Sequence, residues 1–230
     1  MSCFAGPYNR GIVTSGLVLY YDVNEPVCYS SGRTDIQDLS RNGNTGTLVN
    51  GVGYSANNGG SLVFDGVNDY IGIPNNTALD TLTPTVEVWI KTNTTSQNGF
   101  WFEKGSVNTQ YSLFQEGGSI QWRMNIGGIT NLTTTTANFI NTSNWYQVVG
   151  TYTSGTRRLY INGILVNSDT QSGTIATNSG GMSIGVYGGF SGGRGYYYNG
   201  NLSSCRIYNR ALSATEIQQN FNASRNRFGI

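Results

Sequence analysis

The sequence has no histidine, and that absence excludes several kinds of functional site at once. Without histidine the chain cannot build a Ser-His-Asp triad, a Cys-His dyad or any His-ligated metal centre. Charged residues make up only 11% of the 230 residues, and 13 Lys and Arg against 12 Asp and Glu leave a net charge of +1. A protein that binds nucleic acid through bulk electrostatics needs a clear basic excess, so that class is excluded as well.

Cysteine and long apolar runs are also scarce. Cys3, Cys28 and Cys205 are odd in number and widely spaced, which predicts free thiols in a protein made in a reducing cytoplasm. No apolar run approaches the roughly 18 residues of a membrane-spanning helix. Residues 1–15 lack a charged segment followed by an apolar one, so the sequence predicts no signal peptide.

The chain is rich in glycine and aromatic residues, and its hydrophobic pattern is of the strand type. Hydrophobic residues make up 37% and aromatic residues 12% of the chain, which is enough for a folded core. Residues Thr85–Lys91 alternate with a period of two, which places Glu87 and Trp89 on the face opposite the aliphatic side chains. Asn162 and Gly163 separate two β-rich runs, and because both tolerate positive φ they predict a two-residue hairpin.

The remaining pattern indicates an all-β domain with one short helix near its C-terminus. Short apolar runs between turn residues predict further strands at Leu17–Tyr21, Ser61–Phe64, Tyr70–Ile73, Gly99–Lys104, Tyr111–Gln115, Ile120–Ile126, Trp145–Tyr152, Met182–Val186 and Leu202–Tyr208. Such a series is typical of a sandwich or jelly roll. Ser213 and Glu216 form a capping-box pattern that begins a helix ending near Phe221. We interpret the Thr- and Asn-rich runs Asn131–Thr136 and Gly188–Gly195 as loops.

Several segments, taken in their order along the chain, resemble a known family. They are Gly16–Asp22, Asp38–Asn44, Gly46–Leu48, Ser61–Ile71, Val86–Ile90, Trp145–Val149, Leu159–Gly163 and Arg206–Ser213. The ordered set is similar to the laminin-G-like branch of the concanavalin A-like lectin/glucanase superfamily, over residues 16–221. The resemblance implies a concanavalin A-like jelly-roll sandwich of two antiparallel sheets, with a concave and a convex face. We therefore expect an N-terminal arm (1–15), a jelly-roll domain (16–221) and a C-terminal tail (222–230).

The N-terminal part of the sequence resembles a more specific group within this family. Residues 17–22 (LVLYYD) and 38–48 (DLSRNGNTGTL) are similar to versions of this domain in structural proteins of tailed phages. This implies a non-enzymatic virion structural protein, a capsid decoration, fibre or tail component, that attaches to other virion proteins and forms homo-oligomers. A virion location after synthesis in the host cytoplasm agrees with the missing signal peptide. The alternative is a cellular carbohydrate-binding module that targets a polysaccharide.

The carboxylates do not show the arrangement that glycan hydrolysis requires. Relatives that cleave glycans carry acidic residues at alternate positions of one concave-face strand, and retaining hydrolysis needs two carboxyl groups about 5–5.5 Å apart. Glu87 has Thr85 and Trp89 as its same-face neighbours, and Glu103 and Glu116 are equally isolated. We therefore expect no catalytic residues. A glycan hydrolase would instead show an activity that disappears with Glu87→Gln.

We expect no cofactor, apart from the question of a structural calcium ion. Asp65, Asn68 and Asp69 place three oxygen-bearing side chains within one turn, and hard oxygen donors suit Ca²⁺. The resemblance implies a metal in some relatives, often with an acidic pair before the Arg-Ile-Tyr-Asn-Arg motif, where this chain has Ser203 and Ser204. Because Ca²⁺ takes six to eight oxygen ligands, we favour a turn in which these side chains bond backbone amides.

Aromatic residues are candidates for contact with a glycan or a protein, because rings stack on the C–H faces of sugars and anchor interfaces. Those in or beside Gly- and Asn-rich stretches are Trp101, Trp122, Tyr187, Tyr196, Tyr197 and Tyr198. The competing interpretation places the strand aromatics, above all the tryptophans, in the core. Since consecutive strand residues face opposite ways, at least one ring among the three tyrosines 196–198 should be exposed.

The two ends are candidates for attachment to other proteins. The expected arm carries Phe4, Tyr8 and Arg10, and the expected tail carries Arg225, Arg227 and Phe228. Aromatic residues and arginine are enriched in interface cores, so we expect at least one end to pack on another subunit or another virion protein. The displayed domain has a host-surface glycan as its further expected partner.

Overall fold

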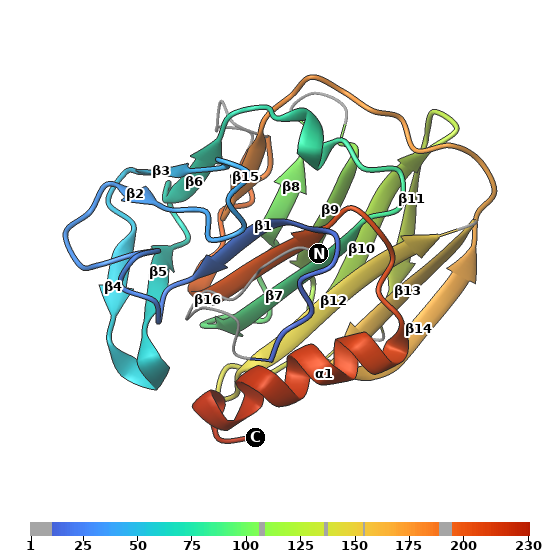
Figure 1. The fold of residues 1–230 in the computed structure, drawn as a ribbon. Coiled ribbons are helices and arrows are strands. Elements are labelled where there is room, and N and C mark those ends of the chain that lie inside the picture. The colour runs from blue at the N-terminus through green and yellow to red at the C-terminus, as the bar shows by residue number, and fades with distance from the viewer. Residues whose placement is uncertain (1–10, 106–108, 136–137, 154, 189–194) are drawn as a thin grey trace.

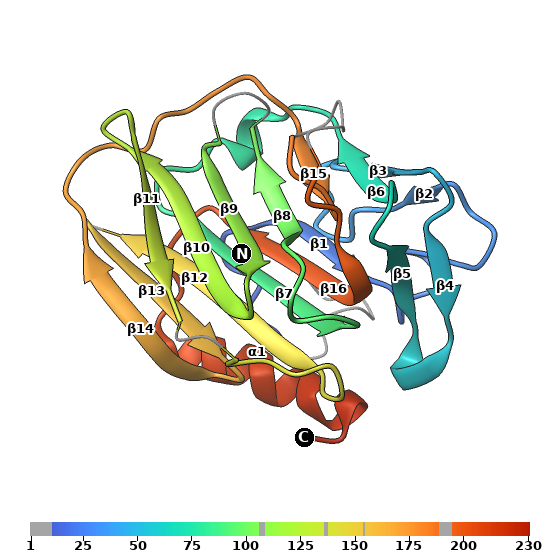
Figure 2. The same cartoon turned by 180° about the vertical axis from the view of Figure 1, so that it is seen from behind.

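The computed structural model describes residues 11–105, 109–135, 138–153, 155–188 and 195–230, which form two packed antiparallel β-sheets (Figures 1 and 2). One sheet, which we call the covered sheet, has the strand order β14 (Ile164–Thr170), β13 (Thr156–Ile161), β12 (Tyr146–Thr153), β7 (Thr85–Thr92), β16 (Asn199–Tyr208), β5 (Ser61–Asp65) and β4 (Gly53–Ser55), with β1 (Leu17–Asp22) paired to β16. The other, the open sheet, has the order β11 (Ile129–Thr134), β10 (Ser119–Ile126), β9 (Tyr111–Glu116), β8 (Gly99–Lys104), β15 (Met182–Ile184), β6 (Tyr70–Ile73), β3 (Gly46–Val49) and β2 (Asp35–Ile36).

Helical structure is sparse and short. The α-helix α1 spans Ala214–Ser224, and 3-10 turns are present at η1 (Asn57–Gly59), η2 (Thr77–Leu79) and η4 (Arg225–Phe228). Two antiparallel sheets with one short C-terminal helix are the architecture that the alternation and hairpin patterns predict, so the predicted fold class is confirmed.

The main hydrophobic core fills the space between the sheets. The aliphatic face of β7 points into it, as the alternation of Thr85–Lys91 predicts, and Trp122 of the open sheet reaches in from the other side. A Cβ atom at Gly150 of β12 would lie 2.4 Å from the Trp122 indole, so only glycine allows the two sheets to approach this closely. The indole Nε1 of Trp122 donates to the carbonyl of Thr151 at 3.2 Å, which joins the two layers directly.

Helix α1 lies over the outer face of the covered sheet (Figure 1). Its N-terminus has the predicted capping box, in which the Ser213 hydroxyl accepts from the Glu216 amide and the Glu216 carboxylate accepts from the Ser213 amide. Leu212, just before the cap, and Ile217 in the helix are buried in one apolar cluster with Tyr208 of β16. The helix is therefore anchored both locally and by its apolar face.

The C-terminal residues pack on their own domain, which corrects the prediction of an attachment tail. Helix α1 continues past Phe221. The Phe228 ring stacks on Trp89 at 4.3 Å between centroids and packs at a tilt against Trp145 at 4.8 Å. The Arg227 guanidinium pairs with the Asp22 carboxylate at 2.6 Å. These side chains are engaged because they cover the Trp89 indole on the outer face of the covered sheet, a contact that the tail composition alone does not reveal.

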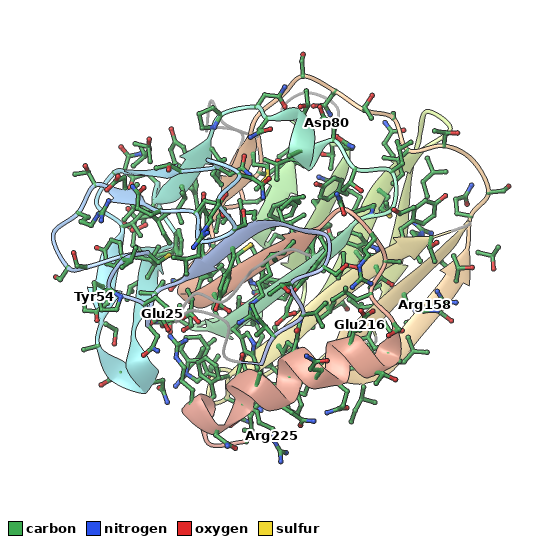
Figure 3. All side chains as sticks on the ribbon, in the orientation of Figure 1. Glu25, Tyr54, Asp80, Arg158, Glu216 and Arg225 are labelled. Carbon is green, nitrogen blue, oxygen red and sulfur yellow. The ribbon has the colours of Figure 1, made fainter. Side chains whose placement is uncertain are left out.

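Arg225 differs from the other two predicted attachment residues of the C-terminus. It is exposed at the end of α1, with its guanidinium 5.8 Å from the Phe221 ring centroid (Figure 3). Of the predicted arm, Ile12 and Val13 are buried against the helix, and the Val13 amide donates to the Asn220 side chain at 2.8 Å. The predicted attachment residues Phe4, Tyr8 and Arg10 lie outside the described residues.

Local predictions mostly agree with the strands, with one clear error. Asn162 and Gly163 have φ of 51° and 78° and close the predicted hairpin between β13 and β14. The prediction of a loop at Asn131–Thr136 was wrong, because most of this run lies in β11, which pairs with β10. Threonine is β-branched and favours extended backbone, and the neighbouring strand supplies the hydrogen bonds that a polar composition does not announce. The other predicted loop, Gly188–Gly195, lies mostly outside the described residues.

Cys28 and Cys205 are both buried free thiols, as predicted, and Cys3 lies outside the described residues. Burial raises the pKa of both thiols well above the ordinary value, which makes them poor nucleophiles in the folded protein. Among the helices that the structure describes, none has the length and apolar character needed to cross a membrane.

Candidate functional site

A cluster of aromatic rings lies on the outer face of the open sheet. Figure 2 shows strands β8, β9 and β10 of this sheet in front, on the side away from α1. Phe100 of β8 and Phe114 of β9 stack with their centroids 4.2 Å apart and their planes 3° from parallel. Tyr187 lies 4.9 Å from Phe100, and Tyr196 lies 6.0 Å from Tyr187. A bulge in β8 between Phe100 and Phe102 lets Phe100 face outward while Phe102 enters the core.

Arg123 of β10 lies in the middle of these rings. Its Cζ is 5.1 Å from the Phe100 centroid, 5.2 Å from that of Phe114 and 5.0 Å from that of Tyr187. These are cation–π distances, so the guanidinium carbon lies near the faces of three aromatic rings. We call Phe100, Phe114, Arg123, Tyr187 and Tyr196 the ring cluster.

Glu103 links Arg123 of the ring cluster to the segment that carries Tyr187. Its Oε1 accepts from Arg123 Nη2 at 3.0 Å and from the Thr109 hydroxyl at 2.5 Å. Its Oε2 accepts from the backbone amide of Gly188 at 2.6 Å, directly after Tyr187. One buried carboxylate therefore joins β8, β10 and the two segments that carry Thr109 and Tyr187.

The ring cluster opens to solvent at one side. The Tyr196 side chain is 53% exposed, Tyr187 is half-buried, and the Arg123 side chain keeps 15% of its surface exposed. Tyr196 has a φ of 56°, a conformation uncommon for a non-glycine residue, which turns its ring to the surface. The expectation that at least one ring among residues 196–198 is exposed is confirmed by Tyr196.

Three of the predicted contact residues belong to the core instead. Trp101, Trp122 and Tyr198 have no exposed surface, so their predicted role in ligand contact is corrected. Trp101 enters the core next to the β8 bulge, and Tyr198 packs on Trp101 at 6.4 Å. Tyr197 is half-buried and lies outside the ring cluster. Sequence analysis missed Phe100, Phe114 and Arg123, although Arg123 between two core side chains of β10 is a polar residue on an outward position.

The covered sheet carries a second buried Glu–Arg pair. Glu87 Oε1 lies 2.5 Å from Arg206 Nη1, with side-chain exposures of 0% and 2%. Gln147 donates to the same oxygen at 3.1 Å, and Asn220 of α1 donates to Oε2 at 2.7 Å. Glu87 is thus enclosed by hydrogen-bond donors beneath a helix, a position that suits a structural ion pair.

The turn predicted as a calcium candidate is held by its own side chains. Asp65 Oδ1 accepts from the amides of Val67 at 2.7 Å and Asn68 at 3.3 Å, and Asp69 Oδ2 accepts from the Asp65 amide at 3.2 Å. Burial raises the pKa of Asp69. Within the described part of the chain, no group of three or more Asp, Glu, Cys or His residues lies close enough to hold a metal ion. The donors at this turn do not make up the six to eight oxygens of a Ca²⁺ site, and its hydrogen bonds agree with the turn that the sequence favours over calcium.

Solved structures with the same fold include binding domains of bacterial toxins. The binding domain of Paraclostridial Mosquitocidal Protein 1 superposes with a TM-score of 0.73 at 19% identity, over 90% of this chain and 52% of that one. The binding domain of botulinum neurotoxin serotype D superposes with a TM-score of 0.71 at 15% identity, over 91% and 52%. The receptor binding domain of botulinum neurotoxin type G gives 0.68 at 16% identity, over 90% and 51%.

The likeness to these structures concerns the fold, because every identity is low and this chain spans about half the length of each of them. A comparison with curated protein sequences finds no match. A model of the concanavalin A-like lectin/glucanases superfamily, of laminin-G type, matches residues 65–218, which is more than half of the chain. Two packed antiparallel sheets with a ring cluster on one face agree with that match, and the chain therefore belongs to the laminin-G-like domains of the concanavalin A-like lectin/glucanases superfamily.

Proposed function

We propose that this chain is a non-enzymatic, lectin-like binding domain that recognises a glycan at the ring cluster. The observation that carries the proposal is the Tyr196 ring, 53% exposed beside Tyr187 and Arg123 on the open sheet. Sugars bind to proteins through such a combination, in which a ring packs on the C–H face and nearby polar groups bond the hydroxyls. The names of the structural neighbours as binding and receptor binding domains support the same class of function.

The state of the carboxylates supports a binding role over hydrolysis. Glycoside hydrolysis uses two carboxyl groups that reach the same bond. Glu87 and Glu103 are fully buried, lie on different sheets, and are each paired with an arginine. A carboxylate enclosed in this way is fixed as an acceptor and does not face a substrate.

Isothermal titration after a glycan-array screen tests the proposal. The wild-type chain is expected to bind at least one array glycan saturably, and Tyr196→Ala is expected to abolish that binding. Tyr54→Ala is the matched control, because Tyr54 is 40% exposed on β4 of the covered sheet, away from the ring cluster (Figure 3). If no glycan binds, or if both variants lose binding equally, glycan recognition at the ring cluster is refuted.

The narrower proposal is that this domain is a structural component of a tailed-phage virion. Its support is the similarity of residues 17–22 and 38–48 to phage versions of the domain. The domain would be displayed on the capsid, a fibre or the tail, and would attach to other virion proteins and to copies of itself. Mass spectrometry of purified particles is expected to find the chain at many copies. Its absence from particles would favour the alternative, a cellular carbohydrate-binding module.

A further inference from the structure

We infer that the ring cluster selects uncharged glycans, with Arg123 acting as a hydrogen-bond donor to a sugar hydroxyl and not as an anion receptor. This inference rests on the proposed glycan-binding function and adds the class of ligand. It follows from how the five N–H groups of Arg123 are used and from the charges around it.

The guanidinium of Arg123 has one nitrogen left for a ligand. Nε donates to the Ser112 hydroxyl at 3.0 Å, and Nη2 donates to Glu103 at 3.0 Å and to the Thr109 hydroxyl at 2.8 Å. Nη1 has no hydrogen-bond partner among the described residues. With Nε and Nη2 engaged by described residues, Nη1 supplies the donors that remain.

This pattern rules out the usual way in which arginine binds an acid. Arginine recognises carboxylate, sulfate and phosphate groups with two parallel N–H bonds from neighbouring nitrogens. Each such fork of Arg123 includes Nη2, whose two N–H groups are directed to Glu103 and Thr109. The remaining nitrogen fits a single oxygen, such as a sugar hydroxyl.

The charges on this face favour the same conclusion. The Arg123 charge is matched by Glu103 at 3.0 Å, and Glu116 adds a second carboxylate at the end of β9, where Gln121 Nε2 donates to it at 3.4 Å. Among the described residues on the outer face of β8–β10, these are two carboxylates against one guanidinium, so the described charges do not favour an anion. An acidic sugar would meet repulsion there, whereas a neutral sugar would not.

The Tyr196 ring gives the sugar its platform. It is 53% exposed and lies 6.0 Å from Tyr187, whose ring is 5.0 Å from the Arg123 Cζ. A pyranose lying on Tyr196 would therefore lie beside Tyr187, the ring that contacts the Arg123 guanidinium. Stacking on C–H groups requires an apolar sugar face, which neutral hexoses possess.

Titration calorimetry with paired oligosaccharides tests this selectivity on the unaltered protein. The probes are the neutral pentasaccharides of glucose (α- and β-linked), mannose and galactose, each set against pentagalacturonate as the acidic counterpart. We expect a neutral probe to bind at least about tenfold more tightly than pentagalacturonate, a difference of about 1.4 kcal/mol. Between about 0.05 and about 0.5 M NaCl the affinity should change less than about twofold, because no net charge is matched on binding.

A charge-preserving variant separates donation from charge. Arg123→Lys keeps the positive charge but has no planar group to stay between the rings, and should weaken neutral-probe binding by at least about tenfold. Arg158→Lys, on β13 of the covered sheet, is the matched control and should bind like the wild type (Figure 3). Melting curves establish that both variants are folded.

Three results would overturn the inference. They are tighter binding of pentagalacturonate than of every neutral probe, a loss of affinity greater than about tenfold with added salt, and wild-type binding by Arg123→Lys. In each of these cases glycan binding itself stands and only its selectivity is refuted. Binding to no glycan, in the array or the titrations, refutes the proposed function together with the inference.

Discussion

Each sheet carries a Glu–Arg ion pair on its outer face, and the two pairs differ in their exposure to solvent. Glu87 and Arg206 on the covered sheet lie 2.5 Å apart beneath α1, with the Arg206 side chain 2% exposed. Glu103 and Arg123 on the open sheet lie 3.0 Å apart, with the Arg123 side chain 15% exposed. The covered pair is completed by Asn220 from the helix, whereas the open pair is completed by aromatic rings and reaches solvent. The covered pair is thereby sealed from water, and the open pair keeps contact with solvent.

The reason for the difference lies in what packs over each face. Trp89 lies two residues after Glu87 on the same face of β7. The rings of Phe221 and Phe228, from the C-terminal helical segment, stack on it. The described helices provide no such cover over Phe100 and Phe114, which instead stack on each other. An ion pair sealed from water depends on its partners for all solvation, so its disruption costs more than that of a pair at the surface.

The largest expected effect on the free energy of unfolding comes from disrupting the Glu87–Arg206 pair of the covered sheet. Arg206→Met leaves the Glu87 carboxylate buried without its cation, and should lower the free energy of unfolding by about 3–5 kcal/mol. Arg123→Met should cost less, about 1–2 kcal/mol, because the Arg123 side chain is 15% exposed and water can reach the place it leaves, whereas Arg206 is 2% exposed. Chemical denaturation of the two variants measures the difference. Equal losses would show that the helix does not distinguish the two faces.

Removing the Phe228 ring, which covers Trp89 on the covered sheet, should have the next largest effect on the free energy of unfolding. Phe228→Ala deletes a ring that lies 4.3 Å from Trp89 and 4.8 Å from Trp145, and should cost about 3 kcal/mol by the usual penalty for buried phenylalanine. Arg225→Ala, three residues earlier and exposed, is the control and should cost little. Thermal melts followed by tryptophan fluorescence report both. If Phe228→Ala melted at the wild-type temperature, the C-terminal segment would be a loose tail after all.

The helix cap should contribute a smaller, pH-dependent amount. Arg210 bonds and the Ser213 amide lower the pKa of Glu216 from 4.5 to about 2 in the folded protein. The folded state therefore gains stability above pH 4.5 that is lost as the pH falls toward 2. Glu216→Gln should cost about 1 kcal/mol at neutral pH, and the gap to wild type should close in acid. Melting temperatures across that pH range provide the check, and a gap that is constant with pH would contradict it.

The smallest effect on stability is expected at the open face. Tyr196→Ala removes a ring that is 53% exposed, and should change the free energy of unfolding by less than about 0.5 kcal/mol while removing glycan binding. A loss of glycan binding without a loss of stability is what we expect of a residue that contacts the ligand. A large fall in stability from this variant would instead make the ring cluster a structural feature, like the covered pair.

Features that depend on neighbours in the chain could be predicted from the sequence. The hairpin at Asn162 and Gly163 and the capping box at Ser213 both appear as predicted, because each rests on the backbone preferences and hydrogen bonds of a few adjacent residues. The alternation in Thr85–Lys91 likewise predicts which side chains of β7 face the core, since a strand has a period of two. The order of the motifs indicated the family, which the match over residues 65–218 establishes.

The identity of the exposed rings was decided by the tertiary structure. Composition makes Trp101 as good a candidate as Phe100, but the bulge in β8 sends Trp101 inward and Phe100 outward. Phe228 has the composition of an interface residue, yet it is used to cover Trp89 of its own domain. The sequence by itself determined strands, turns, the helix cap and the family, because those depend on local periodicity and local bonds. Which face is sealed and which is open depends on where α1 packs and on one bulge in β8, and these follow from contacts between residues far apart in the chain.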